Sequence, residues 1–65
     1  MLVKDILNLV DFPDEQLVQI YDYDVWDVVQ EDVADAIYPN YMTRDVRGIE
    51  VKNNNVLVLN LEATK

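Results

Sequence analysis

The apolar residues among the first ten positions recur at helical spacing, at Leu2, Val3, Ile6, Leu7 and Val10. This periodicity predicts a short amphipathic helix over residues 2–10 whose apolar stripe packs against the rest of the chain. Pro13 disfavours helix at the residue before it, so we expect the helix to end in the turn over residues 11–14. Phe12, within that turn, is expected to close the bottom of the core.

The next pattern alternates with a period of two, which is typical of strands. It predicts a first strand over residues 17–22 and a second over about 26–30, joined by a tight connection through residues 23–25. Val18 and Ile20 fall on one face of the first strand. The connection contains no glycine, and Asp24 is the residue there that best tolerates a left-handed backbone.

A second short helix is predicted from Val33 to about Tyr38. Asp32 is suited to cap its amino terminus, and the apolar residues Val33, Ala36 and Ile37 follow at helical spacing. Pro39 ends the pattern, because proline cannot donate the backbone hydrogen bond that a continuing helix needs.

The last third of the chain predicts a hairpin, with strands over residues 45–52 and 56–61 and a turn over Asn53–Asn55. A three-residue loop would place Val51 opposite Leu57 and turn the leucines of the last strand inward. A two-residue loop would turn the same leucines to the other face. The first register is favoured because leucines fill a core well and Glu50 and Lys52 then stay outside.

In either register the last strand is apolar on both faces, so one side of the sheet meets either a helix or a partner. Taken together, these elements predict one domain over residues 1–65 of the α+β class. Their order is short helix, hairpin, short helix, hairpin. The sheet is expected to have three or four strands, to be mostly antiparallel and to be covered on one face by helix. At 65 residues the core is small and stability should be modest.

Charge is distributed very unevenly along the chain. The net charge is −8, and no lysine or arginine occurs between Asp5 and Met42. Direct binding to nucleic acid or to an anionic membrane is therefore not expected, because both require a basic surface. Arg44 and Arg47 are placed so that they can reach Asp45, Glu50 or the acidic hairpin. We expect a soluble protein of the bacterial cytoplasm, since no apolar run is long enough to span a membrane.

The residue types that are absent exclude several kinds of chemistry. The chain has no serine, histidine or cysteine, so the usual nucleophile and base pairs cannot form. Its one glycine, Gly48, cannot make a phosphate-binding loop. The acids from Asp22 onward also fail as a calcium loop, because Asp27 stands where the loop requires glycine and Val33 where it requires the bidentate glutamate. We therefore expect no enzyme activity, no cofactor and no metal.

The stretch over residues 16–32 combines acids with aromatic residues and contains no base. Carboxylates at alternate strand positions would form a row on one face, loosely comparable to a nucleic-acid backbone, and aromatic side chains often anchor interfaces. The alternative is that the acids are merely solvated and the aromatics stabilise the hairpin. The predicted partner-binding residues are Asp22, Tyr23, Asp24, Trp26, Asp27, Glu31, Asp32 and Asp35.

Several segments together resemble a known group of proteins. They are residues 3–7, the Phe12–Pro13–Asp14 turn, residues 18–22 and residues 49–59. In this order they are similar to the small acidic accessory proteins of phages and prophages of Gram-positive bacteria. That resemblance implies a phage product acting in the bacterial host cytoplasm, where such proteins are often inhibitors of host machinery, including anti-CRISPR proteins. It assigns a role to no residue.

Two hypotheses of function follow. In the first, the chain is a non-enzymatic protein that binds and inhibits a basic nucleic-acid-handling host protein by mimicking nucleic acid. In the second, it is a small structural or assembly protein that forms a homodimer through its last strand, Val56–Leu61, as an edge strand can.

Overall fold

A computed structural model describes residues 1–64. The elements are one short helix, four strands and two 3-10 turns, connected by short loops. In chain order they are α1 (Val3–Leu7), β1 (Leu17–Asp22), β2 (Asp27–Val33), η1 (Ala34–Ala36), η2 (Pro39–Tyr41), β3 (Val46–Val51) and β4 (Leu57–Leu61).

The four strands form one mixed sheet in the order β2-β1-β4-β3. The pairs β1–β2 and β3–β4 are antiparallel hairpins, whereas β1 and β4 run parallel. The predicted antiparallel character therefore holds within each hairpin but not where the two hairpins join. The join brings together the two strands with the most buried residues, so the strands that profit most from burial occupy the centre.

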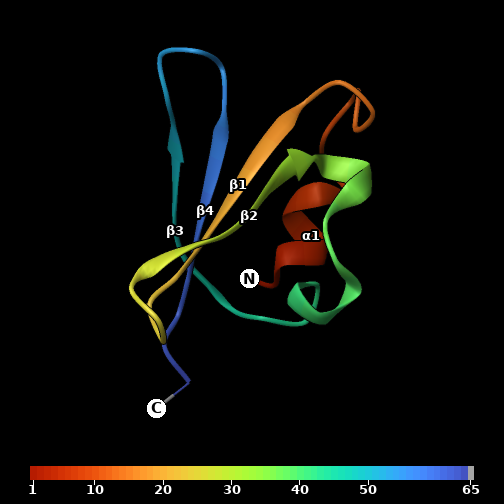
Figure 1. Ribbon diagram of the computed structural model, residues 1–65. Coiled ribbons are helices and arrows are strands. Elements are labelled where there is room, and N and C mark those ends of the chain that lie inside the picture. The colour runs from red at the N-terminus through yellow and green to blue at the C-terminus, as the bar shows by residue number, and fades with distance from the viewer. Residues whose placement is uncertain (65) are drawn as a thin grey trace.

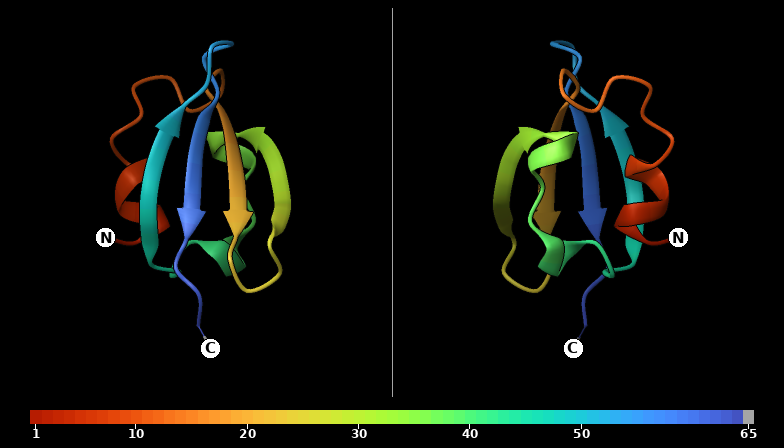
Figure 2. Two further views of the ribbon diagram at one scale, coloured as in Figure 1. Left: turned by 90° about the vertical axis from the view of Figure 1, so that its left-hand side faces the viewer. Right: turned by 90° about the vertical axis from the view of Figure 1, so that its right-hand side faces the viewer.

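One face of the sheet carries α1 and the segment that contains η1 and η2, as Figure 1 shows. The opposite face has no element over it and is turned toward the viewer in the left panel of Figure 2. The predicted helical cover is not confirmed in the form expected, because α1 has only five residues and the rest of this layer consists of 3-10 turns and loops.

The first helix is shorter than predicted, ending at Leu7 rather than near residue 10. At its start the Asp5 carboxylate accepts a hydrogen bond from the Leu2 amide (3.1 Å). The prediction of a second helix, from Val33 to about Tyr38, is wrong. Strand β2 continues to Val33 because Asp32 pairs with Val18 across the sheet, and Asp32 therefore caps no helix. Within the predicted span only the 3-10 turn η1 forms, and its N-cap residue makes no side-chain hydrogen bond.

The core lies between the covered face of the sheet and the short helical layer. Its buried members are Val3, Ile6, Leu7, Val18, Ile20, Ala34, Ile37, Leu59 and Leu61. Phe12 is not among them: its side chain is 66% exposed, so the prediction that it closes the core is wrong. Pro13 instead accepts a hydrogen bond from the Asp35 amide through its carbonyl (3.0 Å), which fixes the turn without using the phenyl ring.

The register favoured for the last hairpin is confirmed. Val51 pairs with Leu57 and Ile49 with Leu59, and the Lys52 amide bonds the Val56 carbonyl (3.0 Å), which leaves a loop over Asn53–Asn55. Leu59 and Leu61 are fully buried in the core, as this register requires.

Val58 lies on the uncovered face of the sheet and is nevertheless buried. Gln19 and Glu50 are its neighbours on the adjoining strands. The Lys52 ammonium donates a hydrogen bond to Gln19 Oε1 (3.0 Å), so polar side chains extend over the valine from both sides. Long polar side chains can cover apolar surface in this way while their heads remain in water. The second apolar face of β4 thus needs neither a helix nor a partner to bury this residue.

The first hairpin agrees with the sequence in β1, which spans the predicted residues. Strand β2 begins one residue later than predicted, and the connection covers residues 23–26. Trp26, not Asp24, takes the left-handed backbone, with φ of 55°. An irregularity in the pairing after Ile20 also adds an extra residue, Val29, to β2.

We expect Leu59→Ala to be far more destabilising than Ile49→Ala, although the two residues are direct cross-strand partners. Leu59 is fully buried in a central strand, so its truncation should cost about 2–5 kcal/mol. Ile49 lies in the edge strand and is half exposed, so its truncation should cost much less. Urea unfolding followed by circular dichroism measures both, and equal losses of stability would contradict the burial described here.

Candidate protein-binding surface

Asp22, the last residue of β1, forms a bidentate salt bridge with Arg44. Arg44 Nη1 donates to Asp22 Oδ2 (3.1 Å) and Arg44 Nη2 to Asp22 Oδ1 (3.0 Å). Asp22 is only 6% exposed and is the one charged residue of the described chain that is buried. The hydrogen bonds from Arg44 lower the pKa of Asp22, against the opposing effect of its burial. This carboxylate is therefore held in its charged form.

Asp24 extends the same cluster. Its Oδ2 accepts from Arg44 Nη2 (3.1 Å) and from the Thr64 hydroxyl (2.6 Å), and its Oδ1 accepts from the Thr64 amide (2.8 Å). Arg44 also donates to the Glu62 carbonyl (3.2 Å). The cluster thus connects the first hairpin, the loop before β3 and the residues after β4.

These contacts remove Asp22 and Asp24 from the predicted row of solvent-exposed carboxylates. Asp22 is buried, and Asp24 lies in the turn rather than on a strand. The expectation that Arg44 reaches the acidic hairpin is confirmed. A row of negative charge therefore does not begin at Asp22, because an arginine supplied from elsewhere in the chain neutralises this part of the hairpin.

Tyr21, Tyr23 and Trp26 form a continuous aromatic row beside that cluster. The rings of Tyr21 and Tyr23 lie 5.2 Å apart and those of Tyr23 and Trp26 also 5.2 Å, in both cases edge to face. The Arg47 guanidinium lies over the Tyr23 ring, 4.6 Å from its centre. Contacts of this kind stabilise the hairpin. Trp26 is nevertheless 72% exposed at the open end of the row.

The remaining predicted residues lie along β2, at the edge of the sheet, and in the turn that follows it. They are Asp27, Glu31, Asp32 and Asp35, and all four are exposed. Glu31 and Asp32 are adjacent on a strand and so point to opposite faces. Within residues 1–64, no lysine or arginine lies within ion-pair distance of any of these four carboxylates. The structure thus places them along one edge of the sheet, not in a single row.

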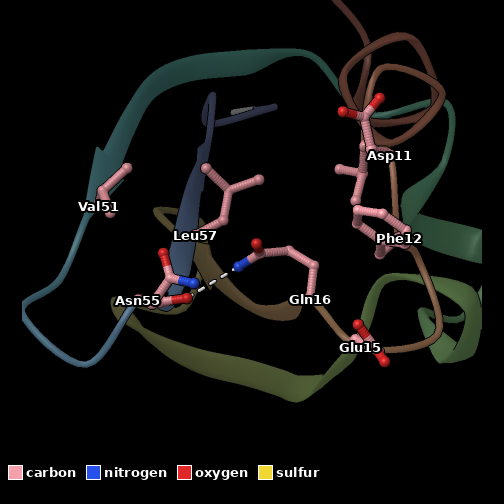
Figure 3. Close-up of a pocket in the computed structure, with 8 residues that line it drawn as sticks. Asp11, Phe12, Glu15, Gln16, Val51, Asn55 and Leu57 are labelled. Carbon is pink, nitrogen blue, oxygen red and sulfur yellow. Dashed lines mark hydrogen bonds between the residues drawn. The ribbon is translucent and has the colours of Figure 1, made fainter.

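A groove at the opposite end of the sheet was missed by the sequence analysis. It has a volume of ≈ 420 Å³ and lies between β3, β4 and the loop after α1 (Figure 3). Its walls are Val10, Asp11, Phe12, Glu15, Gln16, Val51, Asn55 and Leu57. One signal was present in the sequence, because the favoured register turns Ile49 and Val51 toward the same face of the sheet as the leucines of the last strand.

No cluster of three or more histidine, cysteine or acidic residues within residues 1–64 is arranged to hold a metal ion. None of the helices in this part of the chain is long and apolar enough to cross a membrane. The exposed carboxylates and Trp26 are groups of a kind that can contact another macromolecule.

Comparison with known protein families, with curated proteins and with solved structures gave no match. The resemblance to small acidic phage proteins accordingly stays a prediction.

The Asp22–Arg44 pair should make stability depend on pH in a defined direction. The pKa of Asp22 is lower in the folded chain than in the unfolded chain, where it is about 3.9. The ionised carboxylate therefore stabilises the fold fully above pH ~3.9, and this stabilisation is lost as the pH falls through the pKa of the folded state. Asp22→Asn should therefore cost about 1–3 kcal/mol at pH 7. The difference in unfolding free energy between the two proteins should shrink as the pH falls below about 4.

Urea unfolding of the wild type and of Asp22→Asn at a series of pH values measures the difference in their free energies of unfolding. Because the other carboxylates are the same in the two proteins, their contributions cancel in this difference. Asp35→Asn is the matched control, since Asp35 is exposed and has no basic partner within residues 1–64. A difference between wild type and Asp22→Asn that stays constant down to the lowest pH would show that the ionised form of Asp22 is not what stabilises the fold.

Proposed function

We propose that this chain is a non-enzymatic binding protein that engages a basic, nucleic-acid-handling protein through the β2 edge and inhibits it by occupying its nucleic-acid site. The observation that supports this most directly is the set of exposed carboxylates at Asp27, Glu31, Asp32 and Asp35, none of which has a basic partner within residues 1–64. Unpaired charge of one sign along an edge attracts an oppositely charged surface and speeds its association.

The aromatic row supports the same surface as an interface. Trp26 lies beside Asp27 at the start of β2 and is 72% exposed, although tryptophan is costly to leave in water. Its left-handed backbone adds strain that a glycine or asparagine would avoid. Tryptophan is among the residue types most often found as anchors of protein interfaces. Tyr23 packs edge to face against Trp26 and so helps to hold it in place.

The proposed surface differs from the one that the sequence predicted. Asp22 and Asp24 belong to the Arg44 cluster, so reversing their charge would damage the fold before it tested binding. The setting implied by the resemblance, a phage product acting on a bacterial host protein, is part of the proposal and defines the lysate used to test it.

The alternative of self-association through the last strand loses its geometric basis. Strand β4 lies between β1 and β3 and pairs with both, so it has no free edge to offer a second copy. The free edges of the sheet belong to β2 and β3.

Charge reversal at the β2 edge should abolish capture of a basic partner. Tagged protein is exposed to a nuclease-treated lysate of Gram-positive bacteria at low salt, eluted with a salt step and analysed by mass spectrometry. We expect one nucleic-acid-binding protein in the salt eluate. Glu31→Lys with Asp32→Lys should weaken its binding by about tenfold or more, because attraction becomes repulsion.

The matched control is Asp45→Lys with Glu62→Lys, which changes the net charge by the same amount away from β2. Capture that survives the β2 double variant but not the control double variant would place the interface elsewhere. Recovery of the bait alone from the wild-type experiment would contradict the proposal.

Trp26→Asn separates the role of this residue in binding from its role in the fold. Asparagine accepts the left-handed backbone, which offsets the lost contact with Tyr23, so stability should change by less than ~1 kcal/mol. Binding to the captured protein should nevertheless weaken, which titration calorimetry with the purified partner measures. Unchanged affinity would remove Trp26 from the interface.

A further inference from the structure

A second recognition surface lies at the other edge of the sheet, on β3. The outer edge of β3 has no neighbouring strand over most of its length. Its apolar side chains are unusually exposed, with Ile49 at 50% and Val51 at 69%. Ile49 sits opposite the core residue Leu59 and Val51 opposite the half-buried Leu57, so both lie on the covered face of the sheet at a place where the cover ends.

The backbone of this edge offers hydrogen bonds. Residues of an antiparallel pair alternate between bonding the partner strand and pointing away from it. The Lys52 amide bonds the Val56 carbonyl, so Lys52 and Glu50 face β4. The amides and carbonyls of Ile49 and Val51 therefore face the open edge.

The chain already uses the beginning of this edge to hold an extended segment. The Val46 amide donates to the Met1 carbonyl (2.8 Å), and Leu2 forms an antiparallel bridge with Asp45. A bound strand would occupy the next positions along the same edge, at Ile49 and Val51. Addition of a strand to an exposed sheet edge is a common mode of peptide recognition.

The groove beside this edge determines which peptide fits. Val51 and Leu57 form one side of it and Phe12 the other, and the hydrogen bond from Gln16 Nε2 to the Asn55 carbonyl (2.8 Å) crosses between them (Figure 3). Among residues 1–64, the charged residues that line the groove are Asp11 and Glu15, and no lysine or arginine of this part of the chain lines it. The groove thus accepts apolar side chains at its centre and positive charge at its rim.

We propose that β3 and this groove bind an extended basic segment of another protein, which adds to the sheet as a strand and places alternate apolar side chains against Val51 and Phe12. A second copy of this chain fits less well. It would bring another acidic rim to the groove, on a molecule whose net charge is already −8. This surface is separate from the β2 edge, which lies at the far side of the sheet.

The probe is a synthetic peptide with blocked ends in which valine and threonine alternate between terminal lysines. It is added to the isotope-labelled protein at low salt, and amide shifts are followed by NMR. We expect the largest changes at Ile49 and Val51. A peptide with terminal glutamates in place of the lysines should bind much more weakly, because the rim would then repel it.

Two pairs of variants test the two parts of the site. Val51→Lys should abolish binding of the lysine peptide, whereas Val25→Lys, at an exposed valine (58%) in the first hairpin, should not. Asp11→Asn with Glu15→Gln should weaken binding by roughly fivefold, since each partly screened pair contributes up to ~1 kcal/mol. Asp45→Asn with Glu62→Gln makes the same change in net charge elsewhere and should have little effect.

Three results would overturn the proposal. One is the absence of shift changes in the wild-type protein at millimolar peptide, about the weakest binding that such a site could show. Another is a set of shift changes confined to β2. The third is a concentration-dependent dimer that produces the same shifts at Ile49 and Val51 without peptide, which would identify a second copy as the occupant of the edge.

Discussion

The Asp22–Arg44 pair is the interaction on which the arrangement of the chain most depends. Asp22 ends β1, Arg44 precedes β3, and the same guanidinium reaches the Glu62 carbonyl beyond β4. Three segments that are distant in sequence therefore meet at one planar group. Arginine suits this position because its fixed fork of donors can satisfy two carboxylates and a carbonyl together, which a lysine could not. In a chain that has no cysteine and hence no disulfide, this cluster supplies a specific connection that apolar packing alone does not.

The mixed sheet follows from where burial is greatest. In β1 the alternate residues Val18, Ile20 and Asp22 are buried, and in β4 the buried residues include Val58, Leu59 and Leu61. Placing these two strands side by side in the centre protects both and leaves the more polar β2 and β3 at the edges. The connection from β2 to β3 then has to pass along one face of the sheet, and it supplies the 3-10 turns that cover the core there (Figure 1).

The sequence was informative where a pattern is local. The alternation of residues 17–22 defined β1, and the spacing of apolar residues around Asn53–Asn55 identified the correct register. It failed where tertiary contacts overrode local preference. Asp32 is a good helix cap in isolation, but pairing with Val18 keeps it in a strand, and Phe12 reads as a core residue although Pro13 makes the contact that fixes its turn. The parallel pairing of β1 and β4 has no local signature at all.

The candidate surface was only partly predictable for the same reason. The excess of acids was visible from composition, but which acids are free depends on where Arg44 lies, and Arg44 is twenty or more residues away along the chain. Of the eight predicted residues, the structure leaves Trp26 and four carboxylates exposed along β2 and uses Asp22 and Asp24 to hold the fold. Charge counted along a sequence therefore overstates the charge that a folded surface presents.

The two edge strands, β2 and β3, carry features that oppose pairing with another strand. Exposed strand edges invite association, and proteins often prevent it with charged side chains, irregular pairing or a covering segment. Strand β2 has the first two devices, in its unpaired carboxylates and its extra residue Val29. Strand β3 has a pairing irregularity near Gly48, and Met1 and Leu2 cover its beginning. What distinguishes β3 is that Ile49 and Val51 are apolar and exposed at its open edge, and that Val51 lines a groove. The same negative charge that repels a second copy there would attract a basic segment, so protection against self-association and selection of a partner can arise from one distribution of charge.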